Sequence, residues 1–119
     1  MAKSVLLISR HAPWAGVSAA EALDIALAAG AFDLPLSVLF MDDGVLQLLA
    51  QQQPHSLEQK DLSANLQALP MFGIEQLYVA QQCLAQRGLG DSPLALAADR
   101  LDDQQIQQLI RQYDYVVTL

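Results

Sequence analysis

Apolar residues follow two different patterns that alternate along this chain. Short continuous apolar runs are typical of strands buried on both faces of a parallel sheet, and they occupy residues 3–9, 34–40, 77–80, 93–97 and 115–119. Segments typical of helices packed on one side lie at 18–30, 43–52, 62–70, 81–87 and 102–113. We therefore predict an α/β fold for a single domain over residues 1–119. Its mostly parallel sheet of about five strands is covered by helices on both faces, as a three-layer sandwich.

The sharpest change of pattern falls at residues 37–49. There an apolar run ends in Asp42, Asp43 and Gly44 and then resumes at helical spacing, which predicts a buried strand that turns directly into a helix. An aspartate side chain can cap the unpaired amides at the start of that helix, and glycine allows a tight turn. Because such junctions carry ligand or partner sites in open α/β folds, this junction is the first candidate site.

The composition indicates more apolar surface than one small domain can bury. Hydrophobic residues make up 53% of the 119 residues and charged residues 16%, against roughly 25% charged residues in typical domains. A domain of this size has a high ratio of surface to volume. We therefore expect the apolar surplus to lie in subunit interfaces, and we expect an oligomer.

The net charge and the lengths of the apolar runs limit the possible partners and the cellular location. The net charge is −7, and only six Lys and Arg residues are scattered along the chain, so we expect no direct contact with nucleic acid. No apolar run approaches the roughly 20 residues of a membrane-spanning helix. The apolar run at residues 5–8 is too short for the core of a signal peptide. We therefore expect a cytoplasmic protein that does not associate with membranes.

Cys83 is the single cysteine of the chain, which excludes an internal disulfide and a Cys-x-x-Cys redox or zinc site. It falls about one turn into the predicted helix at 81–87. The positive end of a helix favours a thiolate, so Cys83 is a candidate for sulfur transfer through a persulfide. The alternative is that Cys83 is a small apolar residue that packs the helix onto the sheet.

The first strand-to-helix loop holds two further candidates. His11 lies at the same end of the sheet as Asp42 and Asp43, where it could form an acid–base pair, or it could be a surface residue. Trp14 is the sole tryptophan and is either an interface anchor or an internal packing residue. Residues 12–16 contain one glycine and a proline, so they do not form a phosphate loop. We expect no cofactor, and the two histidines lie too far apart in sequence to indicate a metal site.

Several short motifs, taken together in their order and spacing, resemble the DsrE/DsrF-like family of small sulfur-relay proteins, and in particular its TusC/DsrF subunits. The resemblance covers nearly the whole chain. The motifs are Ala12-Pro13, Glu21-Ala-Leu-Asp24, Asp43-Gly-Val45 followed by Gln47-Leu-Leu49, Leu69-Pro-Met-Phe-Gly-Ile-Glu75, Gln86-Arg-Gly-Leu89 and Tyr113-Asp114.

The resemblance implies a DsrE-like fold and a subunit role. TusC-like chains assemble with TusB-like and TusD-like subunits into a heterohexamer, a dimer of heterotrimers. That complex takes persulfide sulfur from TusA and passes it, with TusE, towards 2-thiolation of the tRNA wobble uridine. A DsrF-like role in dissimilatory sulfur oxidation is the alternative, and neighbouring genes would separate the two. A homo-oligomeric domain of another role is the least specific possibility.

The resemblance also bears on which residue carries sulfur. In sulfur-carrying relatives the reactive cysteine lies at a strand end, eight residues before the glycine of the Arg-Gly pair. That glycine is Gly88 here, so the equivalent position is Ala80, and alanine cannot form a persulfide. Cys83 lies three residues later and does not inherit the role through proximity. We therefore expect a subunit that is not catalytic on its own, with Trp14, Asp43 and Gly44 as interface candidates, although a persulfide carrier through Cys83 stays an alternative.

Overall fold

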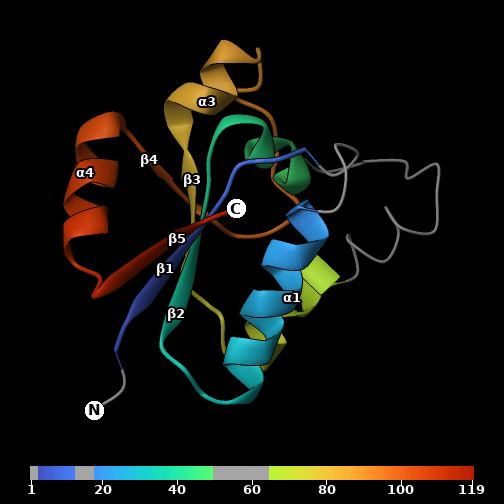
Figure 1. Cartoon of the computed structure of the whole chain (residues 1–119). Coiled ribbons are helices and arrows are strands. Elements are labelled where there is room, and N and C mark those ends of the chain that lie inside the picture. Colours follow the sequence, from blue (N-terminus) through green and yellow to red (C-terminus); the bar gives the residue numbers. More distant parts are fainter. Residues whose placement is uncertain (1–2, 13–17, 50–64) are drawn as a thin grey trace.

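Five parallel strands form the middle layer of the structure (Figure 1), a computed structural model that describes residues 3–12, 18–49 and 65–119. Their order across the sheet is β4-β3-β2-β1-β5. Successive strands thus move outward from β1, and the chain then returns to place β5 on the other side of β1. The predicted α/β class and parallel sheet are confirmed. The strands are β1 (Val5–Ser9), β2 (Leu36–Phe40), β3 (Leu77–Ala80), β4 (Asp99–Leu101) and β5 (Tyr115–Thr118).

Helices cover both faces of the sheet. Figure 1 shows α1 and η2 on one side of the sheet, α4 on the other, and α3 at the end of the sheet where β3 finishes. A helical turn at residues 65–68 leads directly into η2. The helical elements are α1 (Ser18–Ala31), the 3₁₀ helix η1 (Asp42–Leu48), the 3₁₀ helix η2 (Leu69–Phe72), α3 (Gln81–Gln86) and α4 (Asp103–Arg111).

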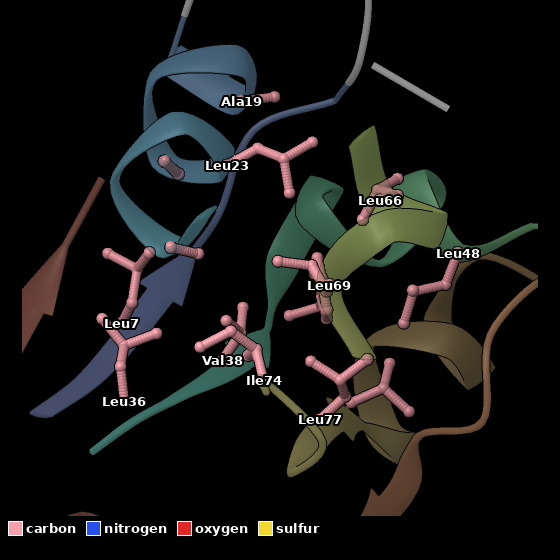
Figure 2. Close-up of a cluster of buried hydrophobic side chains, with 14 of the residues drawn as sticks. Leu7, Ala19, Leu23, Leu36, Val38, Leu48, Leu66, Leu69, Ile74 and Leu77 are labelled. Carbon is pink, nitrogen blue, oxygen red and sulfur yellow. The ribbon is translucent and has the colours of Figure 1, made fainter. Parts of the chain in front are cut away.

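The larger hydrophobic core lies between the sheet and the layer of α1 and η2. Side chains alternate between the two faces of a strand, so Leu7 of β1 and Val38 of β2 point into this core. Leu23 of α1 and Leu69 of η2 meet them there, as Figure 2 shows. All four of these side chains are buried.

A smaller core lies between the other face of the sheet and α4. Leu6 and Leu39 lie one residue along from their neighbours in the larger core and pack against Ile106 and Leu109 of α4. Tyr78 of β3 lies at its border. Burial, together with the charge of Tyr113 and its hydrogen bond to Tyr78, raises the pKa of Tyr78 above the ordinary value of 10.0.

The end of α1 differs from the sequence prediction. The helix continues through Ala31 rather than stopping at Gly30, and Asp33, with φ of 56°, adopts the left-handed conformation that closes the turn. Gly30 has a different role. A Cβ atom there would lie 2.4 Å from the carbonyl oxygen of Phe72, so the glycine permits close contact between α1 and η2.

The prediction of a strand at residues 93–97 is wrong. The fourth strand is β4, and Leu94 makes only an isolated antiparallel bridge to Leu49. The apolar residues Leu94 and Leu96 instead pack on the edge of the larger core. β4 is an edge strand with the sequence Asp-Arg-Leu, and a short polar edge strand lacks the apolar pattern by which buried strands are found.

β5 is the opposite edge strand, and its side chains are exposed on both faces. Val116 pairs in register with Leu6 and Val117 with Leu7, so they face the α4 side and the α1 side, respectively. Tyr115, Val116 and Val117 are large apolar side chains left at the surface. Part of the expected apolar surplus therefore lies on this edge.

Candidate functional site at the carboxyl end of the sheet

The loops that follow β1, β2 and β3 meet at one edge of the sheet. In a parallel sheet all carboxyl ends lie at the same edge, which is where open α/β folds place their sites. Arg10 follows β1, Asp42 and Asp43 follow β2, and Cys83 lies in α3 just after β3. The predicted junction at residues 42–44 is therefore brought together with Cys83, although 40 residues separate them in sequence.

Two ion pairs hold the aspartates at this edge. Asp42 Oδ2 lies 2.6 Å from Arg10 Nε, and Asp43 Oδ1 lies 2.7 Å from Arg87 Nη2. Arg87 also donates from Nη1 to the carbonyl oxygen of Cys83, at 3.0 Å. The pairs therefore tie the loop after β2 to the loop after β1 and to α3. Sequence reasoning missed both arginines because their partners are distant in the chain.

The prediction that Asp42 or Asp43 caps the helix after β2 is wrong. The cap position of η1 is Met41, whose side chain makes no capping hydrogen bond. Asp42 is already inside the 3₁₀ helix, and its φ of 49° is a left-handed conformation. A residue with that backbone geometry does not have the extended conformation of an N-cap, so its carboxylate is directed to Arg10 instead.

Gly44 fits this junction for steric reasons. It is buried, and a Cβ atom on it would lie 2.0 Å from the carbonyl oxygen of Ser9 at the end of β1. The amide of Gly44 donates to the carbonyl of Met41 at 2.8 Å. The glycine therefore allows the backbones after β2 and at the end of β1 to touch. Its predicted role in an interface, like that of Asp43, stays a prediction.

Gln47 is a buried polar residue that sequence reasoning did not single out. Its Nε2 atom donates to Ser9 Oγ and to the carbonyl oxygen of His11, both at 2.9 Å. Buried polar side chains are stabilised when their hydrogen bonds are satisfied, so Gln47 fixes the chain just after β1. The sequence feature that could have indicated it is the position of Gln47 between Val45 and Leu48, which are both buried.

The sulfur of Cys83 lies within this arrangement and is partly buried. The backbone amide of Asp42 donates to Cys83 Sγ at 3.2 Å, and the Asp42 carboxylate oxygen Oδ1 lies 4.0 Å from the sulfur. An amide donor stabilises a thiolate, whereas a nearby carboxylate disfavours one. Cys83 also packs against both hydrophobic cores, so the packing alternative and the thiol alternative both fit its position.

Ala80 is the last residue of β3 and is buried, with 1% of its surface exposed. It packs in the smaller core beside Leu39 and Ile106. The strand end at which a thiol is expected in sulfur-carrying relatives thus holds a methyl group. Sulfur chemistry at that position is not available to this chain.

The other sequence candidates are placed as follows. His11 is exposed, and the two nearby aspartates pair with arginines, so the predicted acid–base pair with His11 is not formed. Trp14 and His55 lie outside the described residues. Within the described part of the chain no group of three or more His, Cys, Asp or Glu side chains is placed to hold a metal ion. None of the described helices combines the length and the apolar character that crossing a membrane requires.

Comparison with known proteins assigns the family. The model of the DsrE/DsrF-like family matches residues 3–119. The chain belongs to this family. A Pseudomonas aeruginosa protein named "Protein TusC homolog" is 59% identical over 119 residues, which is the full length of both chains. A protein of the same name from Vibrio vulnificus is 40% identical over 101 residues, covering 85% of this chain and 86% of its own.

A solved structure supports the fold of this family member. The YchN protein of Escherichia coli superposes with a TM-score of 0.85, covering 98% of this chain and 99% of its own. Their sequence identity is 21%. The likeness therefore concerns the fold, including the three-layer arrangement around the parallel sheet.

Proposed function

We propose that this chain is the TusC-type subunit of a cytoplasmic sulfur-relay complex, and that it has no catalytic activity of its own. In this proposal it assembles with TusB-like and TusD-like chains into a heterohexamer. The complex accepts persulfide sulfur from a TusA-like donor and delivers it to a TusE-like acceptor for 2-thiolation of the tRNA wobble uridine. The chain contributes surface to the complex, and a partner contributes the working thiol.

The observation that carries this proposal is the 59% identity to a TusC homolog over the full length of both chains. The geometry adds two supports. The strand end after β3 holds Ala80 rather than a cysteine, so persulfide chemistry is left to another subunit. Large apolar side chains are exposed on β5 and beside η2, which favours a protein that works in an assembly.

Two alternative functions can be tested by the experiment described below. A DsrF-like role in sulfur oxidation would use the same fold, and the TusC names of the relatives favour the tRNA pathway over it. A persulfide carrier through Cys83 is favoured by one contact, the hydrogen bond from the Asp42 amide to Cys83 Sγ. In that case a donor persulfide would lose its outer sulfur to the Cys83 thiolate, and the donor would leave as a thiolate.

The test is co-expression of the chain with the TusB-like and TusD-like chains of the same organism. We expect a stable complex by light scattering, and after exposure to TusA persulfide a single added sulfur on the partner but not on this chain by intact mass spectrometry. Cys83→Ser is the matched control because serine keeps an acceptor for the Asp42 amide. The variant complex should transfer sulfur to TusE at the wild-type rate.

Three results would contradict the proposal. The chain could fail to join either partner, which removes the subunit role. An added sulfur on Cys83, with transfer lost in Cys83→Ser, would make the chain a carrier. Unchanged 2-thiouridine in tRNA after deletion of the gene would remove the tRNA pathway and favour the sulfur-oxidation alternative.

A further inference from the structure

Four large apolar side chains are exposed where the end of α1 lies beside η2, away from the candidate site. They are Phe32, Leu34, Met71 and Phe72, and we call them the amino-edge patch. Phe32 is 79% exposed and Met71 is 85% exposed. In Figure 1 the end of α1 and η2 lie side by side, towards the end of the sheet opposite α3.

The backbone under the amino-edge patch is held firmly. In the turn after α1, Phe32 donates its amide to the carbonyl of Ala28 at 3.2 Å, and Leu34 donates to Ala29 at 2.9 Å. In the turn after η2, Gly73 has a φ of 88° and its amide donates to the carbonyl of Pro70 at 3.1 Å. The exposure of these side chains is therefore a consequence of two fixed turns.

Two adjoining hollows accompany the patch. One of ≈ 470 Å³ lies between the two turns and is lined in part by Asp33, Met71 and Phe72. Another of ≈ 320 Å³ lies at the amino ends of β1, β2 and β3 and is lined in part by Leu34 and Glu75. Gly73 lines both hollows. Projecting apolar side chains next to hollows give a surface shaped to interlock with another apolar surface.

The charges around the amino-edge patch select between possible occupants. Of the described residues that line the two hollows, Asp33 and Glu75 are acidic and none is Lys or Arg. Two copies of this chain brought together over the patch would place acidic groups close to one another, and like charges across an interface are unfavourable. A different chain with apolar side chains flanked by Lys or Arg would match both features.

We propose that the amino-edge patch is the docking surface for a different polypeptide, whose contact face is apolar and rimmed by basic residues. This inference rests on the proposed function, in which the partner is one of the two other subunits. It adds a second contact region, at the opposite edge of the sheet from the predicted interface residues Asp43 and Gly44. The acids steer the basic partner, and the four apolar side chains supply the buried contact.

A competition experiment tests this assignment. The wild-type chain and a Phe32→Ser/Met71→Gln variant are co-expressed with the two other subunits, one of which is tagged. Intact mass spectrometry then compares the share of each form in the purified complex with its share in the lysate. We expect at least about a tenfold depletion of the variant, because truncated hot-spot residues cost this much or more.

A matched control and a charge variant sharpen the test. Ile25→Gln replaces an exposed apolar side chain of α1 that lies outside the amino-edge patch, and this variant should be recovered at its lysate share. Glu75→Lys should be depleted at low salt, and the depletion should shrink as salt is raised because exposed charges are screened. Both altered positions in the competing variant are exposed, so its thermal unfolding should match that of the wild type.

The outcomes separate this inference from the proposed function. Recovery of the Phe32→Ser/Met71→Gln variant at its lysate share, with the wild type also in the complex, would overturn the docking surface and leave the subunit role. Absence of the wild type from the tagged partners would overturn both. A homodimer of the wild-type chain that is lost in the variant would make the occupant a second copy and overturn the assignment to a different chain.

Discussion

Gly44 is the residue on which the junction between β1 and η1 depends most directly. A Cβ atom at this position would lie 2.0 Å from a backbone oxygen, that of Ser9, and a backbone atom cannot move aside as a side chain can. We expect Gly44→Ala to lower the free energy of unfolding by about 1–3 kcal/mol, the usual cost of overpacking. Urea denaturation followed by circular dichroism measures this change.

Gly90→Ala is the control for this prediction. A Cβ atom at Gly90 would make ordinary contacts, 3.5 Å from the side chain of Gln81. The free energy of unfolding should then change by less than about 1 kcal/mol, and alanine can be slightly stabilising because it restricts the unfolded chain. Equal losses in the two variants would contradict a specific steric role for Gly44.

The location of the candidate site could be predicted from sequence, but the interactions of its side chains could not. The run that ends in Asp42, Asp43 and Gly44 correctly indicated a junction at the carboxyl end of a buried strand. The uses of the aspartates could not be read from it, because Arg10 and Arg87 lie far away in the chain and meet them only after folding. Local rules favour capping, and the tertiary partners decide otherwise.

Among the helices, α4 shows how local sequence and structure can agree. The predicted helical segment at residues 102–113 begins at Asp102, whose carboxylate caps α4 by accepting a hydrogen bond from the amide of Gln105 at 2.8 Å. The Gln105 side chain accepts one from the amide of Asp102 at 2.9 Å, which completes a capping box. All donors and acceptors lie within four residues, so the sequence window contains everything that the cap requires.

Loss of this cap should cost a measurable amount of stability. We expect Asp102→Ala to lower the free energy of unfolding by about 1 kcal/mol, because the amide of Gln105 loses its partner. Asp102→Asn keeps an acceptor oxygen and should lose at most a few tenths of that amount. Thermal unfolding of the three proteins in one buffer gives the comparison. A loss of the same size in Asp102→Asn would point to charge rather than capping.

Over the whole molecule, the central strands and one edge strand were predictable from sequence, and the other edge strand was not. β2 is buried along its full length, and its sequence is apolar except for Ser37, so the sequence predicts a buried strand there. β4 at one edge is polar and was missed, whereas β5 at the other edge is apolar and was found although all its residues are exposed. An apolar sequence therefore indicates a buried strand in β2, whereas in β5 it indicates an exposed surface that is available for assembly.

This contrast between the centre and the edge gives a matched pair of substitutions. Val38 in β2 is 3% exposed and Val117 in β5 is 41% exposed. Val38→Ala removes two buried methyl groups and leaves a cavity in the larger core, so we expect it to lower the free energy of unfolding of the isolated chain by about 2 kcal/mol. Val117→Ala should cost less than about 1 kcal/mol, because water already contacts that side chain. Urea denaturation of the two variants measures these losses, provided that the slope of the unfolding free energy against urea stays unchanged. A larger loss in Val38→Ala than in Val117→Ala would support the prediction. Equal losses would mean that β5 is buried in the isolated chain, contrary to its place at the edge of the sheet.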